Sequence, residues 1–266
     1  MQSDRPQRVL VTGATGVLGR SLLGRPAAAG YTLRGTGRGA PPEGAGIEWT
    51  RSDLANGEGL EAAVSEVDTI IHAASSPRAD TERIDVQGTM RLLEAARRAG
   101  VRHVIYVSIV GIDRIPFAYY RHKLAAEREV EAGRVPWTIV RGTQFHDFVD
   151  TLFGGMMKLP VGFLPKDFRV QPVHVDDFAD VLWACAAAAP ARHAPEVGGP
   201  EVLRYGEMIH PWMAAHGMKK PVLNLPLPGG LATALRQGKG TTPDHAVGTL
   251  TWKDWLATKY GGTALV

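Results

Sequence analysis

Three glycines spaced three residues apart follow the first apolar run of the chain. The segment reads Val9-Leu10-Val11-Thr12-Gly13-Ala14-Thr15-Gly16-Val17-Leu18-Gly19. Its apolar start predicts a buried parallel strand, and a helix is expected to begin at Val17. Gly13 permits a tight turn, Gly16 lets a phosphate approach the backbone, and Gly19 lets the helix pack closely on the sheet. An ordinary glycine-rich turn is the alternative, but between a strand and a helix the spacing favours a dinucleotide site at the helix N-terminus.

Length and composition describe an ordinary globular chain. Its 266 residues suit one large domain, or one domain with a small second lobe. The formal charge of +3 is small and its Lys and Arg residues are scattered, so we expect no nucleic-acid partner. The longest apolar run, 181–189, is too short to span a bilayer, and residues 1–6 lack the apolar core of a signal peptide. We therefore expect a cytoplasmic protein with no membrane partner.

Cysteine and histidine usage argues against an internal disulfide and against a metal site. The single cysteine, Cys185, lies inside an apolar run and is expected to be a buried thiol. No cluster of Cys and His has the spacing of metal ligands, so no metal is expected.

Strand and helix patterns alternate over the first half of the chain. Strands are predicted over 9–12, 31–36, 47–49, 69–73, 104–108 and 137–141, and helices over 17–29, 60–64, 83–99 and 120–131. Pro26 should end or kink the first of these helices early. The alternation predicts an α/β fold with a doubly wound, parallel, Rossmann-like sheet. We assign residues 1–141 to this dinucleotide-binding core.

The alternation stops after Arg141. Residues 142–172 show little periodicity, and 190–266 hold short elements between Pro and Gly, including a strand at 221–225 and a helix at 251–258. A helix at about 176–189 is expected to return to the core. Residues 142–266 are therefore predicted to be mixed, with a small C-terminal substrate lobe beside the returning elements.

The end of the second predicted strand indicates the cofactor. An NAD-selective site carries Asp or Glu there, but this chain reads Arg34-Gly35-Thr36-Gly37-Arg38. Arg38 can pair with a 2′-phosphate, so NADPH is favoured over NADH, with Arg34 as the weaker candidate. Asp53 and Leu54 follow the third strand and are predicted to border the adenine, although Asp53 is equally suited to capping a helix.

A tyrosine and a lysine four residues apart follow the fifth strand. Tyr119 and Lys123 would share one face of a helix. A tyrosine hydroxyl can donate a proton to a forming alkoxide, and a nearby ammonium can stabilise the phenolate and bind the nicotinamide ribose. This pair predicts carbonyl reduction.

Together, these motifs resemble the short-chain dehydrogenase/reductase superfamily. The resemblance rests on the glycine triplet, Asp53-Leu54, His72-Ala73-Ala74 and Tyr119-x-x-x-Lys123. Segments 120–127, 141–146, 173–179 and 199–201 resemble its atypical, NmrA-like branch. The resemblance implies a Rossmann-like domain with a small C-terminal lobe, and a family that often forms homodimers. Carbonyl-reducing members also use a Ser or Thr, for which Ser108 is the candidate, although Ile109 stands where relatives often carry a second small polar residue.

The resulting hypothesis is an NADPH-dependent oxidoreductase that reduces a carbonyl or quinone-like group of a small, mostly apolar molecule. The alternatives are a non-catalytic NADP(H)-sensing regulator and an NAD-dependent epimerase or dehydratase. The predicted catalytic residues are Tyr119, Lys123 and Ser108, and the predicted substrate pocket contains Gln144, Phe145 and His146. The predicted cofactor residues are Gly13, Thr15, Gly16, Val17, Leu18, Gly19, Arg38, Asp53, Leu54, Ala73, Ala74, Ser75 and Lys123.

Overall fold

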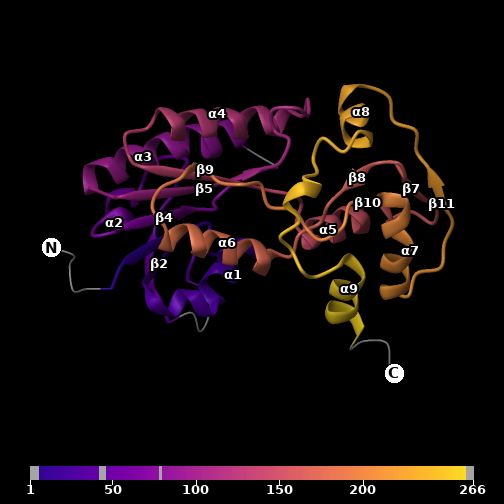
Figure 1. The fold of residues 1–266 in the computed structure, drawn as a ribbon, viewed down its shortest axis with the longest axis horizontal. Helices are drawn as coiled ribbons and strands as arrows, with labels where there is room; N and C mark the ends of the chain where they lie inside the picture. The colour runs from indigo at the N-terminus through magenta and orange to yellow at the C-terminus, as the bar shows by residue number, and fades with distance from the viewer. Residues whose placement is uncertain (1–5, 42–45, 78–79, 262–266) are drawn as a thin grey trace. The chain divides into compact units, whose positions relative to one another are not determined.

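The computed structural model describes residues 6–41, 46–77 and 80–261 and contains a seven-stranded central sheet (Figure 1). The strand order is β3-β2-β1-β4-β5-β6-β9. The strands are β1 (Arg8–Thr12), β2 (Thr32–Gly37), β3 (Glu48–Arg51), β4 (Thr69–His72), β5 (His103–Ile109), β6 (Trp137–Gly142) and β9 (Arg192–His193). β1 is parallel to both β2 and β4, and Thr12 is in register with Thr36 and with His72. The predicted doubly wound, parallel α/β class is confirmed, and the chain reverses its direction across the sheet between β1 and β4.

Helices cover both faces of this sheet. They are α1 (Val17–Gly24), α2 (Leu60–Val64), α3 (Gln87–Ala99), α4 (Ala118–Ala132) and α6 (Val175–Ala187). In Figure 1, α3 and α4 lie on one side of the sheet and α1 and α6 on the other. Buried Leu10, Ile70 and Leu92 belong to the core beneath α3, while the Trp183 indole of α6 donates to the Leu22 carbonyl of α1 at 3.1 Å.

The chain divides into two compact units. The first comprises residues 1–108, 118–141 and 178–195, and the second comprises 109–117, 142–177 and 196–266. The elements of the second unit are α5 (His146–Met156), β7 (Gly162–Leu164), β8 (Arg169–Val170), β10 (Leu203–Arg204), α7 (Tyr205–Ala215), β11 (Val222–Asn224), α8 (Gly230–Arg236) and α9 (Trp252–Tyr260). Phe153, Trp212 and Trp252 lie in its own hydrophobic core. Each unit therefore has an apolar core of its own.

The start of α3 and the end of α1 can be compared with the sequence prediction. α1 ends at Gly24, which agrees with the early end expected from Pro26, and a 3-10 turn (Pro26–Gly30) follows it. The helix predicted over 83–99 instead begins as a π-helical turn (Glu82–Val86) before α3. Within the described ranges, no helix is both long enough and apolar enough to cross a membrane.

Candidate cofactor and catalytic site

The glycine loop between β1 and α1 is closed by backbone contacts. Gly13 has a φ of +65°, which favours glycine, and a Cβ there would lie 2.8 Å from the Ala74 Cα. A Cβ on Gly19 would lie 2.2 Å from the Gly13 carbonyl oxygen. Gly13 thus supplies the tight turn, and Gly19 the close packing, that the spacing predicts.

A cavity of about 260 Å³ opens beside this loop. Its walls follow the carboxyl ends of four neighbouring strands, which is where open α/β sheets bind ligands. It is lined by Thr12, Gly13, Thr15, Gly16, Thr36, Gly37, Arg38, Ser52, Asp53, Leu54, Ala73, Ala74, Ser75, Ser76 and Ile84. The structure therefore brings most of the predicted cofactor residues together. Val17, Leu18 and Gly19 instead form the first turn of α1, where Leu18 and Gly19 are buried.

The two arginines near β2 have different surroundings. The Arg34 guanidinium bonds to the Glu48 carboxylate at 2.8 Å and 3.0 Å and to the Ser65 carbonyl at 2.7 Å, so it joins β2 to β3 and α2. Arg38 is exposed and lines the cavity. Only Arg38 is therefore placed to meet a ligand in the cavity.

Asp53 has the local role and the cavity position that its sequence leaves open. Its Oδ1 accepts the backbone N–H of Ala55 at 2.9 Å, as in a turn or cap. The same residue lines the cavity, at the end of β3. The two interpretations of Asp53 are thus compatible.

A buried histidine ties the end of β4 to β1 and α3. Thr89 Oγ1 donates to the Asp85 carbonyl, so the ring nitrogen Nε2 of His72, 3.0 Å from Thr89 Oγ1, must be the donor to it. His72 Nδ1 is then the acceptor for the Thr12 hydroxyl at 2.7 Å. Burial, together with the charge of Lys123, lowers the pKa of His72 to about 3. His72 is therefore a neutral structural residue with a single tautomer.

Tyr119 contacts Ser75, one of the residues that line the cavity. The Tyr119 hydroxyl lies 2.7 Å from Ser75 Oγ, and Ser75 Oγ donates to Asp85 Oδ1 at 2.5 Å. Burial raises the pKa of Tyr119, and the charge of Asp85 contributes to the increase. No sequence motif identified Asp85. It contacts Ser75 and Ser76 only because the fold brings the π-helical turn close to the loop after β4.

Lys123 lies one helical turn beyond Tyr119 but points into the core. Its Nζ donates to the Tyr106 hydroxyl at 2.7 Å and to the Val107 carbonyl at 2.8 Å. Burial lowers the pKa of Lys123 to about 8, against the opposing charges of Asp85 and Glu127. Ser108 is also buried, at 3% exposure. The described contacts therefore join Tyr119 to Ser75 and Lys123 to Tyr106, and they do not join the predicted Tyr–Lys–Ser set directly.

The predicted substrate residues belong to the second unit. Gln144 and Phe145 are partly exposed there. His146 is fully buried and stacks with the rings of Trp252 and Trp255 at centroid distances of 5.8 Å and 5.4 Å. Burial lowers its pKa to about 4. In this structure His146 is a core residue, and Gln144 and Phe145 stay predictions as pocket residues.

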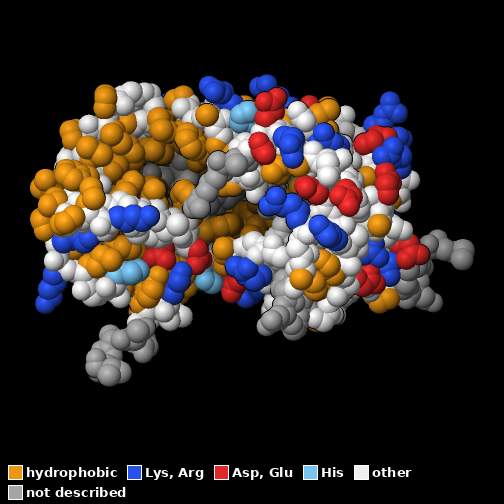
Figure 2. Space-filling view, turned by 180° about the vertical axis from the view of Figure 1, so that it is seen from behind, with side chains coloured by type: hydrophobic (Ala, Val, Ile, Leu, Met, Phe, Trp, Pro, Cys, Tyr) orange, Lys and Arg blue, Asp and Glu red, His pale blue; other side chains and the backbone are white. Residues whose placement is uncertain are grey.

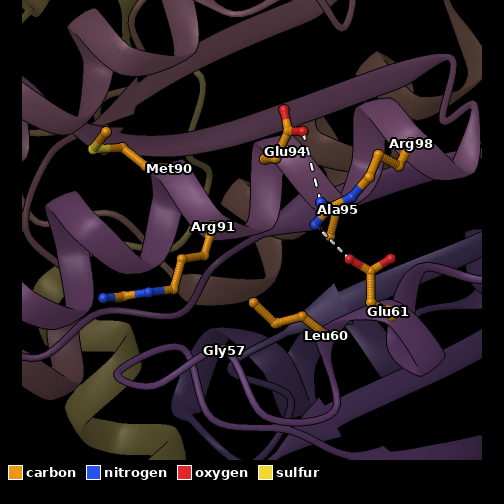
Figure 3. Close-up of a pocket in the computed structure, with 8 residues that line it drawn as sticks. All are labelled: Gly57, Leu60, Glu61, Met90, Arg91, Glu94, Ala95 and Arg98. Atoms are coloured by element: carbon orange, nitrogen blue, oxygen red, sulfur yellow. Dashed lines mark hydrogen bonds and ion pairs between the residues drawn. The ribbon is translucent and has the colours of Figure 1, made fainter.

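A separate groove lies between α2 and α3 (Figure 3). Arg98 bridges Glu61 of α2 and Glu94 of α3, while Arg91 points away from this ion-pair cluster. Exposed pairs of this kind stabilise a protein weakly. The groove contains none of the predicted cofactor or catalytic residues. Among the residues that the structure describes, no group of His, Cys, Asp and Glu could hold a metal ion.

The glycine loop and most of the residues that line the cavity lie within a match to a known sequence family. The family model described as NAD(P)H-binding matches residues 13–189. The chain belongs to this family. This match supports the resemblance to the short-chain dehydrogenase/reductase superfamily, and it shows that the chain carries an NAD(P)H-binding domain.

Known relatives are distant but cover much of the chain. A ceramide reductase of Caulobacter vibrioides is 29% identical, over 86% of this chain and 77% of its own. Uncharacterised mycobacterial proteins, including one from Mycobacterium tuberculosis, are 28% identical over 66% of this chain, which spans only 19% of their length. A triphenylmethane reductase structure from Citrobacter has a TM-score of 0.77 at 18% identity, covering 96% of this chain and 99% of its own. That likeness shows the fold alone, and the same reductase was also solved with NADP(H).

Proposed function

We propose that this protein is an NADPH-dependent reductase of a carbonyl or quinone-like group on a small, mostly apolar molecule. The observation that carries the proposal is the cavity beside the glycine loop, which Arg38 lines and to which Tyr119 is joined through Ser75. A hydroxyl beside a nicotinamide site is the arrangement that carbonyl reduction needs.

The residues of the cavity fit a dinucleotide. Gly13, Gly16 and the N-terminus of α1 would hold the pyrophosphate, because a glycine loop exposes backbone N–H groups at the positive end of a helix. Arg38 would pair with the 2′-phosphate, and Asp53 and Leu54 would border the adenine. When bound, the cofactor supplies the hydride. The structure of the Citrobacter reductase with NADP(H) is compatible with this choice.

Tyr119 is the proposed proton donor and Lys123 its electrostatic partner. The buried ammonium, held by Tyr106 and Val107, provides a positive charge one helical turn from the phenol. A positive charge near the hydroxyl favours the phenolate that proton donation leaves behind.

The surface of the second unit, taken by itself, supports the proposal that the substrate is apolar. On the face shown in Figure 2, hydrophobic side chains gather over this unit. Its exposed large apolar residues include Phe163 and Leu223, which are in register on β7 and β11, and Leu225 beyond them. Ceramide, an apolar molecule, appears in the name of one relative and is compatible with this class.

One observation favours the NADP(H) sensor as a second candidate. Ser108, the expected third member of the catalytic set, is buried, and the described hydrogen bonds of Lys123 go to Tyr106 and Val107. A site that binds the cofactor without completing this set would bind tightly and turn over little.

Tyr119→Phe tests the proposed chemistry. Turnover of a carbonyl or quinone substrate should fall about 100-fold or more, while the Kd for NADPH stays within about twofold, because only the proton donor is removed. A variant that keeps the wild-type turnover would exclude Tyr119 as the donor.

A further inference from the structure

A chain of polar groups runs from the edge of the cavity into the protein interior. Tyr119 OH lies 2.7 Å from Ser75 Oγ, which donates to Asp85 Oδ1 at 2.5 Å. The second carboxyl oxygen of Asp85 accepts the backbone N–H of Ser76 at 2.9 Å. Asp85 is only 2% exposed, whereas Ser75 lines the cavity. An interior carboxyl group is thus connected to the candidate catalytic hydroxyl through one serine.

Asp85, on the π-helical turn, is held by contacts from α3 and from the loop after β4. Its backbone carbonyl accepts the Thr89 hydroxyl at 2.5 Å, and Thr89 is in turn held by His72. Both carboxyl oxygens have donors on the loop after β4. π-helical turns are found frequently at functional sites. Asp85 therefore has a fixed position beneath Ser75.

The chemistry of the three groups sets the direction of each hydrogen bond. A carboxylate only accepts, so the single hydroxyl proton of Ser75 goes to Asp85. The bond between Ser75 and Tyr119 must then be donated by Tyr119.

We propose that Asp85 is a positioning residue that acts through Ser75 to direct the Tyr119 proton inward, and that it stores the proton exchanged with the substrate. The proposal deepens the proposed function and rests on it. In alcohol oxidation, the substrate O–H proton moves to Tyr119, the Tyr119 proton moves to Ser75, and the Ser75 proton moves to Asp85. The hydride of the carbinol C–H bond goes to the oxidised nicotinamide. Reduction reverses each transfer and therefore starts with the proton on Asp85.

Other ionisable groups surround this chain of polar groups. Lys123 and Tyr119 of α4 and Tyr106 of β5 all interact with the charge of Asp85. His72 of β4 is neutral and reaches the Asp85 backbone through Thr89. A test that changes pH must therefore compare variants with the wild type rather than interpret one profile alone.

The test is a double-mutant cycle on Asp85→Asn and Ser75→Ala, with Glu82→Gln as the control. Glu82 is an exposed acid on the same π-helical turn. Rates of reduction and of alcohol oxidation are measured against pH. Each single variant should lower kcat about tenfold or more with little change in KM, and should lose the wild-type change of rate with pH. The double variant should be no slower than Ser75→Ala, because Asp85 acts through Ser75. Glu82→Gln should match the wild type.

Two outcomes would overturn the proposal. One is an Asp85→Asn enzyme that keeps the wild-type pH profile, and the other is a double variant whose losses simply add. If no substrate is turned over, the proposed function fails. The chain of polar groups from Tyr119 to Asp85 can still be tested by ultraviolet titration of tyrosine ionisation. Asp85→Asn should lower the pKa of Tyr119, identified by its disappearance in Asp85→Asn/Tyr119→Phe, and an unchanged pKa would contradict the proposal.

Discussion

Replacing Lys123 with Met gives a stability change with a defined sign and pH range. The Lys123 ammonium is 3% exposed, and its described partners are the neutral Tyr106 hydroxyl and Val107 carbonyl. Burial lowers its pKa from 10.5 to about 8, although Asp85 and Glu127 oppose the shift. The folded protein therefore releases this proton before the unfolded chain does.

The magnitude follows from the difference between the two pKa values. The difference between 10.5 and about 8, at about 1.4 kcal/mol per pKa unit, corresponds to about 3 to 4 kcal/mol. Between about pH 8 and pH 10.5 the unfolded chain holds the proton and the folded one does not. The free energy of unfolding should therefore rise with pH over this range. Lys123→Met removes the ionisation and should remove this rise.

The assay is urea unfolding of the wild type and the variant at several pH values across the range. The two curves are subtracted, because the raised pKa values of Tyr106 and Tyr119 lower the stability of both proteins at the alkaline end. Lys259→Met is the matched control. Burial alone would lower the pKa of Lys259, but its bonds to Asp147 and Asp150 raise it, so this variant should keep the rise. Equal slopes for the wild type and Lys123→Met would refute the reasoning.

Three further predictions follow from single contacts. Gly19→Ala should cost about 3 kcal/mol in urea unfolding, because its Cβ would lie 2.2 Å from a backbone oxygen, whereas Gly24→Ala, with open space around it, should be neutral or slightly stabilising. Arg38→Ala should lower the preference for NADPH over NADH by about tenfold or more in Kd, whereas Arg34→Ala should lower stability and keep the preference; the reverse pattern would contradict the assignment. Stability should fall as pH drops from 6.5 toward 4, where His146 gains a proton in the unfolded chain first, and less so in His146→Phe; an equal acid loss in both proteins would exclude His146 as the cause.

The regular half of the fold could be predicted because local pattern and tertiary structure agree there. The glycine triplet, Pro26 and the strand at 69–72 each favour one local structure. The glycine loop, the end of α1 and β4 all have the structure that these signals favour. α5 could not be predicted from periodicity. It is stabilised by burial of Val149 and Phe153 in the second unit, which depends on segments far along the chain.

The candidate site, too, could be predicted from the sequence only in part. The cavity residues on the loops after β1 and β4 follow from motifs, because the ends of neighbouring parallel strands meet at one edge of the sheet. The partners of Tyr119 and Lys123 do not. Helical spacing placed both side chains on one face of α4, but it could not show that Tyr106 lies beneath Lys123 or that the π-helical turn brings Asp85 to Ser75. Those contacts exist only once three separate elements have packed.

The most direct test of reductase activity is NADPH consumption coupled to product detection, over a panel of quinones, ketones and enones. The account predicts one molecule of reduced product for each NADPH consumed, with NADPH used in preference to NADH. Confirmed NADPH binding with no reduced product from any member of the panel would contradict the reductase assignment and favour the NADP(H) sensor.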